Sequence, residues 1–351
     1  MIDNETPLRS APSLTLPREY TGEGTGVRTA NERVSQIRNH CIPLLSPVTS
    51  DKTIFVTGAN GFVGRSVMDA LLADGCRVRA LVRGNSIERA GVENVRGDLF
   101  DDGPLDMGTA GCDAVVHLVG IIREVAGNTF ERVHHEGTLR VIDAAKRNGV
   151  SRLVHVSALG ARPESESDYA RTKAAAEAAV KASGLGYTIF RPSVILGPGG
   201  EFARMLEGWS RGTQMPYHFM PYFGVGVFGL SPKKVQPVDV RDVAACVAAS
   251  LSMPETIGQS YDLGGPEAMS WPRMYALAST HFTGSPKLQL GFPVWYAKLL
   301  TRLAPAKWLP FNRSQVVMAG EDNVCDPGVM ERVFGIKPRT LMEALSGPSH
   351  S

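Results

Sequence analysis

The sequence predicts an α/β protein built on a doubly wound parallel β-sheet, with a smaller C-terminal α/β lobe. From Thr53 onward, short apolar runs alternate with stretches of helical periodicity. Such alternation is typical of parallel βαβ units joined by right-handed crossovers. The chain has 351 residues, of which 43% are hydrophobic, so it is also long enough to bury a large core.

The predicted strands are the apolar runs, which cover residues 53–57, 76–82, 113–120, 152–157 and 187–192. Helical stretches lie between them around 62–73, 130–148 and 168–183. The helix over 130–148 has the clearest period, because its apolar and small residues share one face: Phe130, Val133, Gly137, Val141, Ala144 and Ala145. Asn148-Gly149 then provides a helix stop.

Composition divides the chain into three parts. We expect a nucleotide-binding domain over 51–200 and a smaller lobe over 201–345, from which 236–265 returns to the sheet. Residues 1–50 are rich in Pro, Thr, Ser, Arg and Glu and show no sustained period, which predicts a disordered extension. Two interpretations of that segment stay open: a genuine tail, or a stretch that precedes the true start of translation near Val48.

Charge and cysteine content exclude several classes of protein. The formal net charge is +2, which does not favour a nucleic-acid surface. The five cysteines are scattered without a Cys-x-x-Cys pair, which is typical of reduced thiols in a cytoplasmic protein without a zinc site. His134 and His135 are adjacent and point about 100° apart on a helix, so we expect no metal site.

A glycine-rich loop follows the first predicted strand. Gly58-x-x-Gly61-x-x-Gly64 lies between that strand and a helix, which is the setting of a dinucleotide-binding Rossmann loop. Gly58 would allow the tight turn, Gly61 the close approach of a pyrophosphate, and Gly64 the packing of helix on strand. The phosphates would meet the positive end of the helix dipole. We assign cofactor contacts to Gly58, Asn60, Gly61, Phe62, Val63 and Gly64.

The end of the second strand indicates which nicotinamide cofactor the loop prefers. An NAD-binding site places Asp or Glu there to bond the ribose 2′-hydroxyl, whereas this chain reads Leu81-Val82-Arg83-Gly84-Asn85. Arg83 could pair with a 2′-phosphate, so NADP(H) is favoured over NAD(H); the alternative is a solvated loop residue. Asp98 and Leu99 are candidates for contacts with the adenine, and Asp98 could equally be a turn residue.

Tyr169 and Lys173 form a Tyr-x-x-x-Lys pair on one face of the helix over 168–183. A nearby ammonium favours a phenolate, so we expect Lys173 to lower the pKa of Tyr169 and to suit it to acid–base work during hydride transfer. Lys173 would also bond the nicotinamide ribose. Arg191-Pro192-Ser193-Val194 lies at the end of the fifth apolar run and would frame the nicotinamide, which adds Pro192 and Val194 to the predicted cofactor contacts.

Together, the glycine loop, Tyr169/Lys173 and Arg191-Pro192 resemble the extended or atypical short-chain dehydrogenases/reductases over most of residues 52–265. HLVGIIRE, HEGT, RLVHVSALGA, YARTKAAAE and FRPSVILGP are closer still to bacterial relatives of the NAD(P)H-binding accessory subunit of respiratory complex I. These are usually labelled NAD-dependent epimerase/dehydratase-like proteins. The first of those segments adds Leu118, Val119 and Gly120 to the predicted cofactor contacts. The resemblance implies a subunit that holds a nucleotide structurally.

One departure from the family concerns catalysis. In the family, the third catalytic residue is a Ser or Thr that bonds the substrate carbonyl. It normally lies one or two places after the serine that ends the strand, which here is Ser157 at the end of the run 152–157, and those places hold Ala158 and Leu159. Ser157 would have to substitute for it. Loss of a preorganised donor typically costs orders of magnitude in rate, which favours binding over turnover. A reductase or epimerase acting on an apolar carbonyl, such as a quinone or isoprenoid, and a redox-sensing regulator stay open as alternatives.

Two segments after residue 200 are rich in apolar side chains that could contact a substrate, a membrane or the smaller lobe itself. Residues 201–235 are rich in Met, aromatic residues and Gly, which fits either an apolar lid over a substrate cleft or ordinary packing of the smaller lobe. Asp239 or Asp242 is expected to cap a helix over 241–252. Residues 293–311 alternate aromatic and leucine residues with Lys and Arg, which fits either a membrane interface or packing on the lobe. We therefore expect a cytoplasmic protein, peripheral at the inner face of the cytoplasmic membrane if this segment binds there.

Overall fold

The computed structural model describes residues 52–125, 127–303, 309 and 311–347. The chain divides into two units, Met1–Ser46 and Pro47–Ser351. The predicted extension over residues 1–50 lies outside the described residues, as do parts of the segment 293–311.

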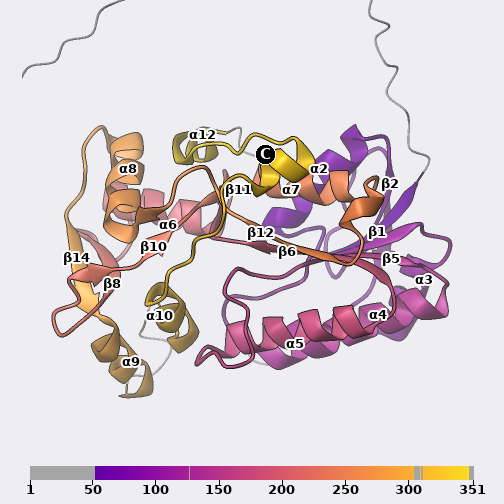
Figure 1. Ribbon diagram of the computed structural model, residues 1–351, viewed down its shortest axis with the longest axis horizontal. Coiled ribbons are helices and arrows are strands. Elements are labelled where there is room, and N and C mark those ends of the chain that lie inside the picture. The colour runs from indigo at the N-terminus through magenta and orange to yellow at the C-terminus, as the bar shows by residue number, and fades with distance from the viewer. Residues whose placement is uncertain (1–51, 126, 304–308, 310, 348–351) are drawn as a thin grey trace, which may run out of the picture. The chain divides into compact units, whose positions relative to one another are not determined.

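A seven-stranded sheet, in the order β3-β2-β1-β4-β5-β6-β12, organises the larger part of the second unit (Figure 1). Every neighbouring pair of strands in it is parallel. This confirms the predicted doubly wound fold. The order reverses between β1 and β4, and ligands of such sheets bind at that point, outside the carboxyl ends of the strands. The strands are β1 (Thr53–Thr57), β2 (Arg77–Val82), β3 (Val92–Arg96), β4 (Ala114–His117), β5 (Arg152–Val156), β6 (Gly186–Pro192) and β12 (Gln259–Leu263).

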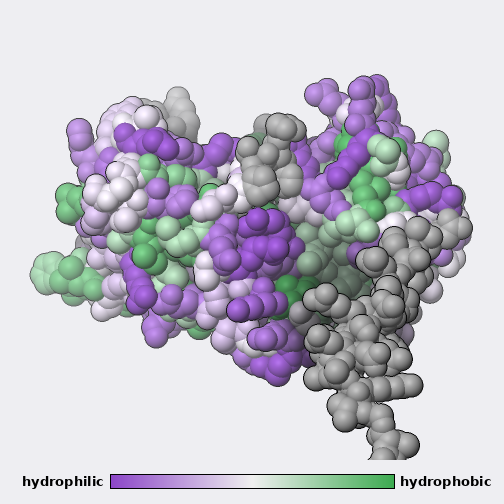
Figure 2. Space-filling model, turned by 90° about the horizontal axis from the view of Figure 1, so that it is seen from above, coloured by the Kyte–Doolittle hydropathy of each residue, from purple (hydrophilic) through white to green (hydrophobic). Residues whose placement is uncertain are grey.

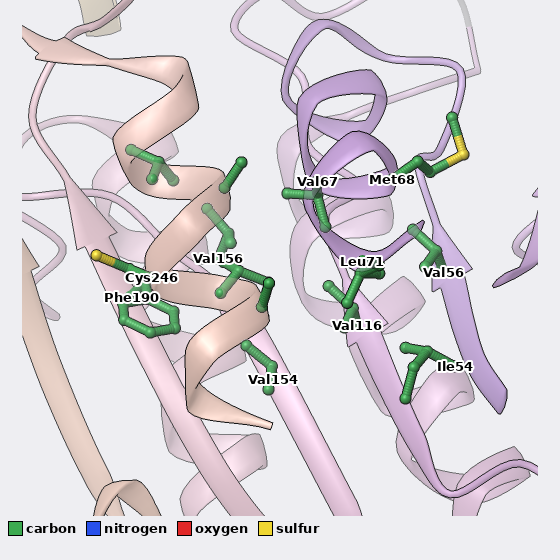
Figure 3. Close-up of a cluster of buried hydrophobic side chains, with 14 of the residues drawn as sticks. Ile54, Val56, Val67, Met68, Leu71, Val116, Val154, Val156, Phe190 and Cys246 are labelled. Atoms are coloured by element: carbon green, nitrogen blue, oxygen red, sulfur yellow. The ribbon is translucent and has the colours of Figure 1, made fainter. Parts of the chain in front are cut away.

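Helices cover both faces of this sheet, because its strands are apolar on both sides. On one face α2 (Phe62–Ala73) and α7 (Val240–Ser250) bury a cluster that includes Val56, Val67, Leu71 and Phe190 (Figure 3). The opposite face is covered by α3 (Asp102–Thr109), α4 (Gly137–Arg147) and α5 (Asp168–Ala182). The core on that side is built on Phe55, Leu105 and Val141.

The helix predicted over 130–148 is not regular from end to end. Its first part is a π-helical turn, Glu131–Glu136, which runs directly into α4. π-turns inside helices are often found at functional sites. The apolar stripe still reaches the core, since Phe130, Val133 and Val141 are buried.

The smaller lobe contains short strands and helices that follow β6. A two-stranded sheet joins β7 (Ile195–Leu196) to β11 (Val238–Asp239), and another joins β10 (Lys234–Val235) to β13 (Met269–Ser270). The third has the order β14-β8-β9, with β14 (Gln289–Pro293), β8 (Met220–Val225) and β9 (Ser231–Pro232). Its helices are α6 (Glu201–Arg211), α8 (Trp271–Thr283), α9 (Val294–Leu303), α10 (Arg313–Ala319) and α12 (Leu341–Ser346). Helix α11 (Val329–Phe334) and a 3₁₀ turn at Pro254–Thr256 lie against the large sheet instead.

Residues 201–211 serve the packing of this lobe. Helix α6 lies against α8, and Leu206, Trp209 and Tyr275 are buried in one cluster. Trp209 meets Tyr275 edge-on at 5.9 Å between ring centroids.

The sequence predicted that Asp239 or Asp242 caps helix α7. Asp239 caps it, because its Oδ1 accepts from the N–H of Arg241 at 2.7 Å. Asp242 has another role, because it is buried and accepts from the backbone N–H of Arg339 (2.7 Å) and from its guanidinium. Phe334 also returns to the sheet, where its ring centroid lies 5.6 Å from that of Phe190. Residues 334–339 therefore pack on the first domain, whereas α12 after them belongs to the core of the smaller lobe.

Candidate functional site

The glycine loop is closely packed on both sides. Gly58 has φ of +80°, and a Cβ there would lie 3.1 Å from the backbone of Leu118 and Val119, in the loop after β4. A Cβ on Gly64 would lie 2.7 Å from the carbonyl oxygen of Ala59 and closer still to that of Gly58. The loop is therefore compressed between α2 and the β4 loop, and only glycine leaves room at both positions.

Helix α2 presents an open N-terminus to this loop. Its N-cap is Gly61, no side chain caps it, and no acid lies in its first turn. The free N–H groups and the helix dipole favour an anion such as a pyrophosphate. Val63 packs on the core, and the ring of Phe62 lies against the turn at Gly197 and Gly200, where added Cβ atoms would approach it to 3.2 and 2.9 Å. These contacts hold the first turn of α2 in place.

The structure brings Arg83 and Asp98 together at the ends of β2 and β3. An Nη1 of Arg83 lies 3.8 Å from Oδ2 of Asp98, and 71% of the Arg83 side chain is exposed. An exposed pair at this distance is weak, so the guanidinium is available to a ligand. Asn60 donates to the carbonyl oxygen of Asn85 (3.1 Å) and ties the glycine loop to the loop after β2. Leu99, by contrast, is buried in the core beside Gly137, which leaves little of it for an adenine ring.

Lys173 lies buried where the ends of β4 and β5 meet α5. Its Nζ donates to the carbonyl oxygen of Val156 at 3.1 Å, and a Cβ on Gly120 would come within 3.1 Å of it. Burial lowers the pKa of Lys173 to about 8, and Glu177 opposes that shift. The predicted lysine and the predicted β4 loop are thus adjacent.

The expectation for Tyr169 was wrong in sign. Its pKa is raised to about 12 by burial, because its ring packs edge-on against Phe130 and His134, at centroid distances of 5.8 and 5.2 Å. The sequence spacing places Lys173 on the same helix face but does not reveal this aromatic enclosure. At neutral pH the phenol keeps its proton, so Tyr169 can donate a hydrogen bond but is poorly suited to act as a base.

Ser157 follows β5 and is 4% exposed. Its N–H donates to the carbonyl oxygen of Phe190 (2.7 Å), and its Oγ has no hydrogen-bond partner among the described residues. A buried hydroxyl without a partner is costly, so a ligand that reached this atom would gain by bonding it.

Arg191 was predicted to help frame the nicotinamide, but its side chain is bound to α5 instead. Its guanidinium forms a two-point ion pair with the buried Glu177, with Nε–Oε1 at 2.8 Å and Nη2–Oε2 at 2.5 Å. It therefore ties β6 to α5. Pro192 is buried at the end of β6, and the carbonyl oxygen of Val194 accepts from Val238 (2.9 Å).

Sequence reasoning considered His134 only as a metal ligand and missed its position in the site. Its Nε2 accepts from the N–H of Ile121 in the β4 loop (3.1 Å), and its Nδ1 lies 2.9 Å from Oγ1 of Thr172, between Tyr169 and Lys173. His134 thus joins the β4 loop to the helix of the Tyr/Lys pair. The available signal was the set of histidines within apolar segments, His117, His134 and His155, all of which are buried.

No group of His, Cys, Asp and Glu side chains in the described part of the chain is arranged to hold a metal ion. The two strand histidines stack on each other instead, with ring centroids 5.3 Å apart. His117 bonds Thr57 and Thr138, at 2.6 and 3.1 Å. Neither ring nitrogen of His155 has a partner among the described residues.

These buried histidines predict a steep loss of stability in acid. Burial lowers the pKa of His117 to about 3 and that of His134 to about 2, and it holds His155 well below 6.5. Below pH 6.5 these histidines become protonated in the unfolded chain but stay neutral in the folded chain. The free energy of unfolding therefore falls by about 1.4 kcal/mol for each histidine and each unit of decreasing pH. Replacing one should flatten this slope.

We expect His155→Leu to reduce the slope of unfolding free energy against pH, between pH 4.5 and 6, by about 1.4 kcal/mol per unit. Urea unfolding at several pH values measures it. His218→Gln, at an exposed histidine, is the control and should leave the slope unchanged. An unaltered slope in His155→Leu would contradict the burial argument.

Comparison with known proteins identifies the family. The family model described as NAD(P)H-binding matches residues 58–208. A reductase of (4-alkanoyl-5-oxo-2,5-dihydrofuran-3-yl)methyl phosphate from Streptomyces griseus is 33% identical over 223 residues, which cover 62% of this chain and 69% of that protein. The chain belongs to the extended short-chain dehydrogenase/reductase-like family. It binds NAD(P)H as its family does.

Within this family, the relatives include respiratory-chain subunits, as the resemblance indicated. Subunit 9 of the mitochondrial NADH dehydrogenase [ubiquinone] 1 alpha subcomplex from Arabidopsis thaliana is 31% identical over 268 residues, which cover 73% of this chain and 64% of that protein. A ceramide reductase from Caulobacter vibrioides is 39% identical over 150 residues, or 42% of this chain and 47% of that protein. The chain thus spans about half to two thirds of the length of these two relatives.

Solved structures of the family share the fold. An NADPH-dependent quinone oxidoreductase from Escherichia coli, solved in complex with NADPH, is similar with a TM-score of 0.64 at 21% identity; the match covers 84% of this chain and 98% of that one. At that identity the likeness concerns the fold alone.

Proposed function

We propose that this protein holds NADP(H) with little turnover, as a nucleotide-holding subunit or assembly factor of a respiratory assembly of the complex I type. Residues 51–200 would bind the nucleotide and residues 201–345 would cover it. We further propose that it works as a peripheral protein at the inner face of the cytoplasmic membrane. One contrast carries the proposal. The glycine cradle, which consists of Gly58, Gly61 and Gly64 at the start of α2, is well formed, whereas the acid–base pair Tyr169/Lys173 is not suited to catalysis.

The cradle supports tight holding. Gly58, Gly61 and Gly64 leave space for a pyrophosphate beside the open N-terminus of α2. Lys173 would bond the nicotinamide ribose, and His134 would hold the β4 loop against the helix that carries this lysine. When bound, the cofactor would supply or accept a hydride.

The acid–base pair supports low turnover. The pKa of Tyr169 is raised to about 12 by burial, while Lys173 donates to the backbone at Val156. Ala158 and Leu159 occupy the two places where the family carries its carbonyl-bonding Ser or Thr. A carbonyl in this site would meet few preorganised donors, and each missing donor costs about 10²–10³ in rate.

We also propose that the site prefers NADP(H) over NAD(H), and a substitution of Arg83 tests this preference. The exposed guanidinium can pair with a 2′-phosphate, whereas Asp98 lies 3.8 Å away and pairs with it only weakly. We expect Arg83→Ala to weaken NADPH binding about 10- to 100-fold, the equivalent of a charge-assisted hydrogen bond, and to leave NADH binding nearly unchanged.

Isothermal titration with both cofactors measures this change. Arg89→Ala is the control, because Arg89 is an arginine of the same βα region that pairs with Asp69. Equal losses for NADH and NADPH in Arg83→Ala would contradict the assignment.

A second candidate function is a reductase that acts on an apolar carbonyl such as a quinone or isoprenoid. The unpartnered Oγ of Ser157 favours it, since that hydroxyl could bond a carbonyl oxygen beside Tyr169. Similar proteins include the ceramide reductase and the quinone oxidoreductase described above. Tyr169 would then protonate the product oxygen.

One experiment separates the two functions. Protein purified without added nucleotide is analysed for bound cofactor by mass spectrometry, and absorbance at 340 nm is followed while quinones, aldehydes of the retinal type and sugar nucleotides are offered. We expect retained NADPH that none of them oxidises. Oxidation that disappears in Tyr169→Phe would overturn the holding role and establish the reductase. Retained NAD⁺ would overturn the preference for NADP(H).

A further inference from the structure

Exposed apolar side chains gather on two neighbouring elements of the smaller lobe. The connection from β8 to β9 exposes Val227, Phe228 and Leu230 by 70, 75 and 74%, and α9 exposes Trp295 by 55% and Leu303 by 73%. We call these five residues the apolar patch. Figure 2 shows hydrophobic side chains at the edge of the molecule where Figure 1 places the β14-β8-β9 sheet.

The two halves of the patch are joined. The indole N–H of Trp295 donates to the carbonyl oxygen of Val227 (3.2 Å). A Cβ on Gly229 would lie 2.6 Å from the backbone of Phe292 and Pro293, at the end of β14. The connection after β8 is thus held against the start of α9, and the apolar side chains of both project from one surface.

The two segments that form this surface carry basic residues. Residues 208–238 and 268–320, which supply the patch and the strands and helices beneath it, contain nine Lys and Arg residues and no Asp or Glu. Lys234 and Arg302 are exposed. Acidic residues directly flank both ranges, and four of the nine basic residues pair with a carboxylate. Arg211 pairs with Glu207 (2.9 Å), Arg273 with Glu267 (2.7 Å), Lys298 with Glu166 (2.6 Å) and Lys233 with Asp322 (3.6 Å). The surface keeps a cationic excess.

We propose that the apolar patch is a docking site for the surface of an anionic phospholipid bilayer. Side chains exposed by more than 70% project into solvent and can enter the acyl boundary, and tryptophan is favoured at the headgroup level. Basic residues around them are attracted to anionic headgroups. An excess of basic residues spread over two segments fits a continuous anionic surface, which attracts all of them at once. No helix in the described ranges is long and apolar enough to cross a membrane, so this contact lies at the surface.

The patch also adjoins the candidate site. Lys298 of α9 pairs with Glu166, which precedes Tyr169 by three residues, and Asn312 donates to the carbonyl oxygen of Ile122 in the β4 loop (2.9 Å). Docking would therefore bring the Tyr/Lys helix close to the lipid. This inference deepens the proposed function by naming its membrane partner, and it holds for either candidate chemistry.

Vesicle sedimentation tests the site with the full chain and without nucleotide. We expect binding to vesicles with 30% phosphatidylserine in phosphatidylcholine (a composition of the order found in anionic leaflets), at least about tenfold weaker binding to pure phosphatidylcholine, and loss of binding in high salt. Phe228→Ser/Leu230→Ser should reduce binding at least about tenfold. Met107→Ser, at an equally exposed methionine on α3 (68%), should bind as the wild type does.

Two results would overturn the docking site: no binding of the wild type to the anionic vesicles, or equal binding by the double variant and Met107→Ser. Thermal unfolding of each variant confirms that the fold is retained. Because the assay contains no nucleotide, failure of vesicle binding leaves the cofactor experiments untouched, and failure of NADPH retention leaves the docking site untouched.

Discussion

Gly64→Ala is expected to weaken NADP(H) binding roughly 100-fold, the largest loss of affinity that we predict for a single added methyl group. The new Cβ would overlap the carbonyl oxygens of Gly58 and Ala59, so α2 would have to move away from β1. Overpacking of this kind costs about 1–3 kcal/mol, and 3 kcal/mol corresponds to about a 100-fold change in affinity. The displaced groups are also those that would face the phosphates in the proposed function.

Titration calorimetry with NADPH gives the affinity, and circular dichroism reports the fold. Gly103→Ala is the matched control, because an added Cβ in α3 has no atom within 4 Å, so its affinity should equal that of the wild type. If Gly64→Ala lowers stability too far, Gly61→Ala provides a milder test, since its Cβ would stand 3.1 Å from Gly58 O. Wild-type affinity in both loop variants would refute the cradle.

Arg191→Met is expected to lower the free energy of unfolding by about 3 kcal/mol, the largest loss of stability among our predictions. It removes the two-point partner of Glu177, whose side chain is 4% exposed. Leaving one charge of a buried pair without its partner costs about 3–5 kcal/mol. We expect the lower end, because Lys181 remains 3.7 Å from Glu177.

Urea denaturation measures the loss, and two further variants interpret it. Arg191→Met/Glu177→Met should regain part of the stability, since neither member of the ion pair is then left without its partner. Arg211→Ala, which breaks an exposed pair with Glu207 on α6, should cost less than about 1 kcal/mol. A loss in Arg191→Met no larger than that of Arg211→Ala would contradict a structural role for this ion pair.

The sequence predicted the frame of the fold well, because local signals define it. The apolar runs predicted five strands of the seven-stranded sheet, and the glycine spacing located the turn from β1 into α2. The edge strands β3 and β12 contain too many polar residues to stand out as apolar runs. The family assignment, read from motifs, is confirmed. Each of these signals lies within a few neighbouring residues, so it does not depend on how distant segments meet.

Predictions that depended on tertiary neighbours were less successful. Tyr169 was expected to titrate low because Lys173 follows it by one helical turn, but Phe130 and His134 enclose its ring and raise its pKa. Arg191 was expected to help frame the nicotinamide because it lies at the end of β6, yet it forms an ion pair with Glu177. The π-turn over Glu131–Glu136 has the same apolar period as a regular helix, so the pattern of residues did not reveal it.

The return of residues 334–339 to the first domain has a consequence for biosynthesis. Phe334 packs on Phe190, and Arg339 bonds the buried Asp242, although these partners are far apart in the chain. A ribosome makes β1 to β6 well before Phe334 and Arg339, so this side of the core is not fully covered until those residues have been made. We expect the parallel sheet to reach its final stability late, with nascent chains depending on chaperones until then.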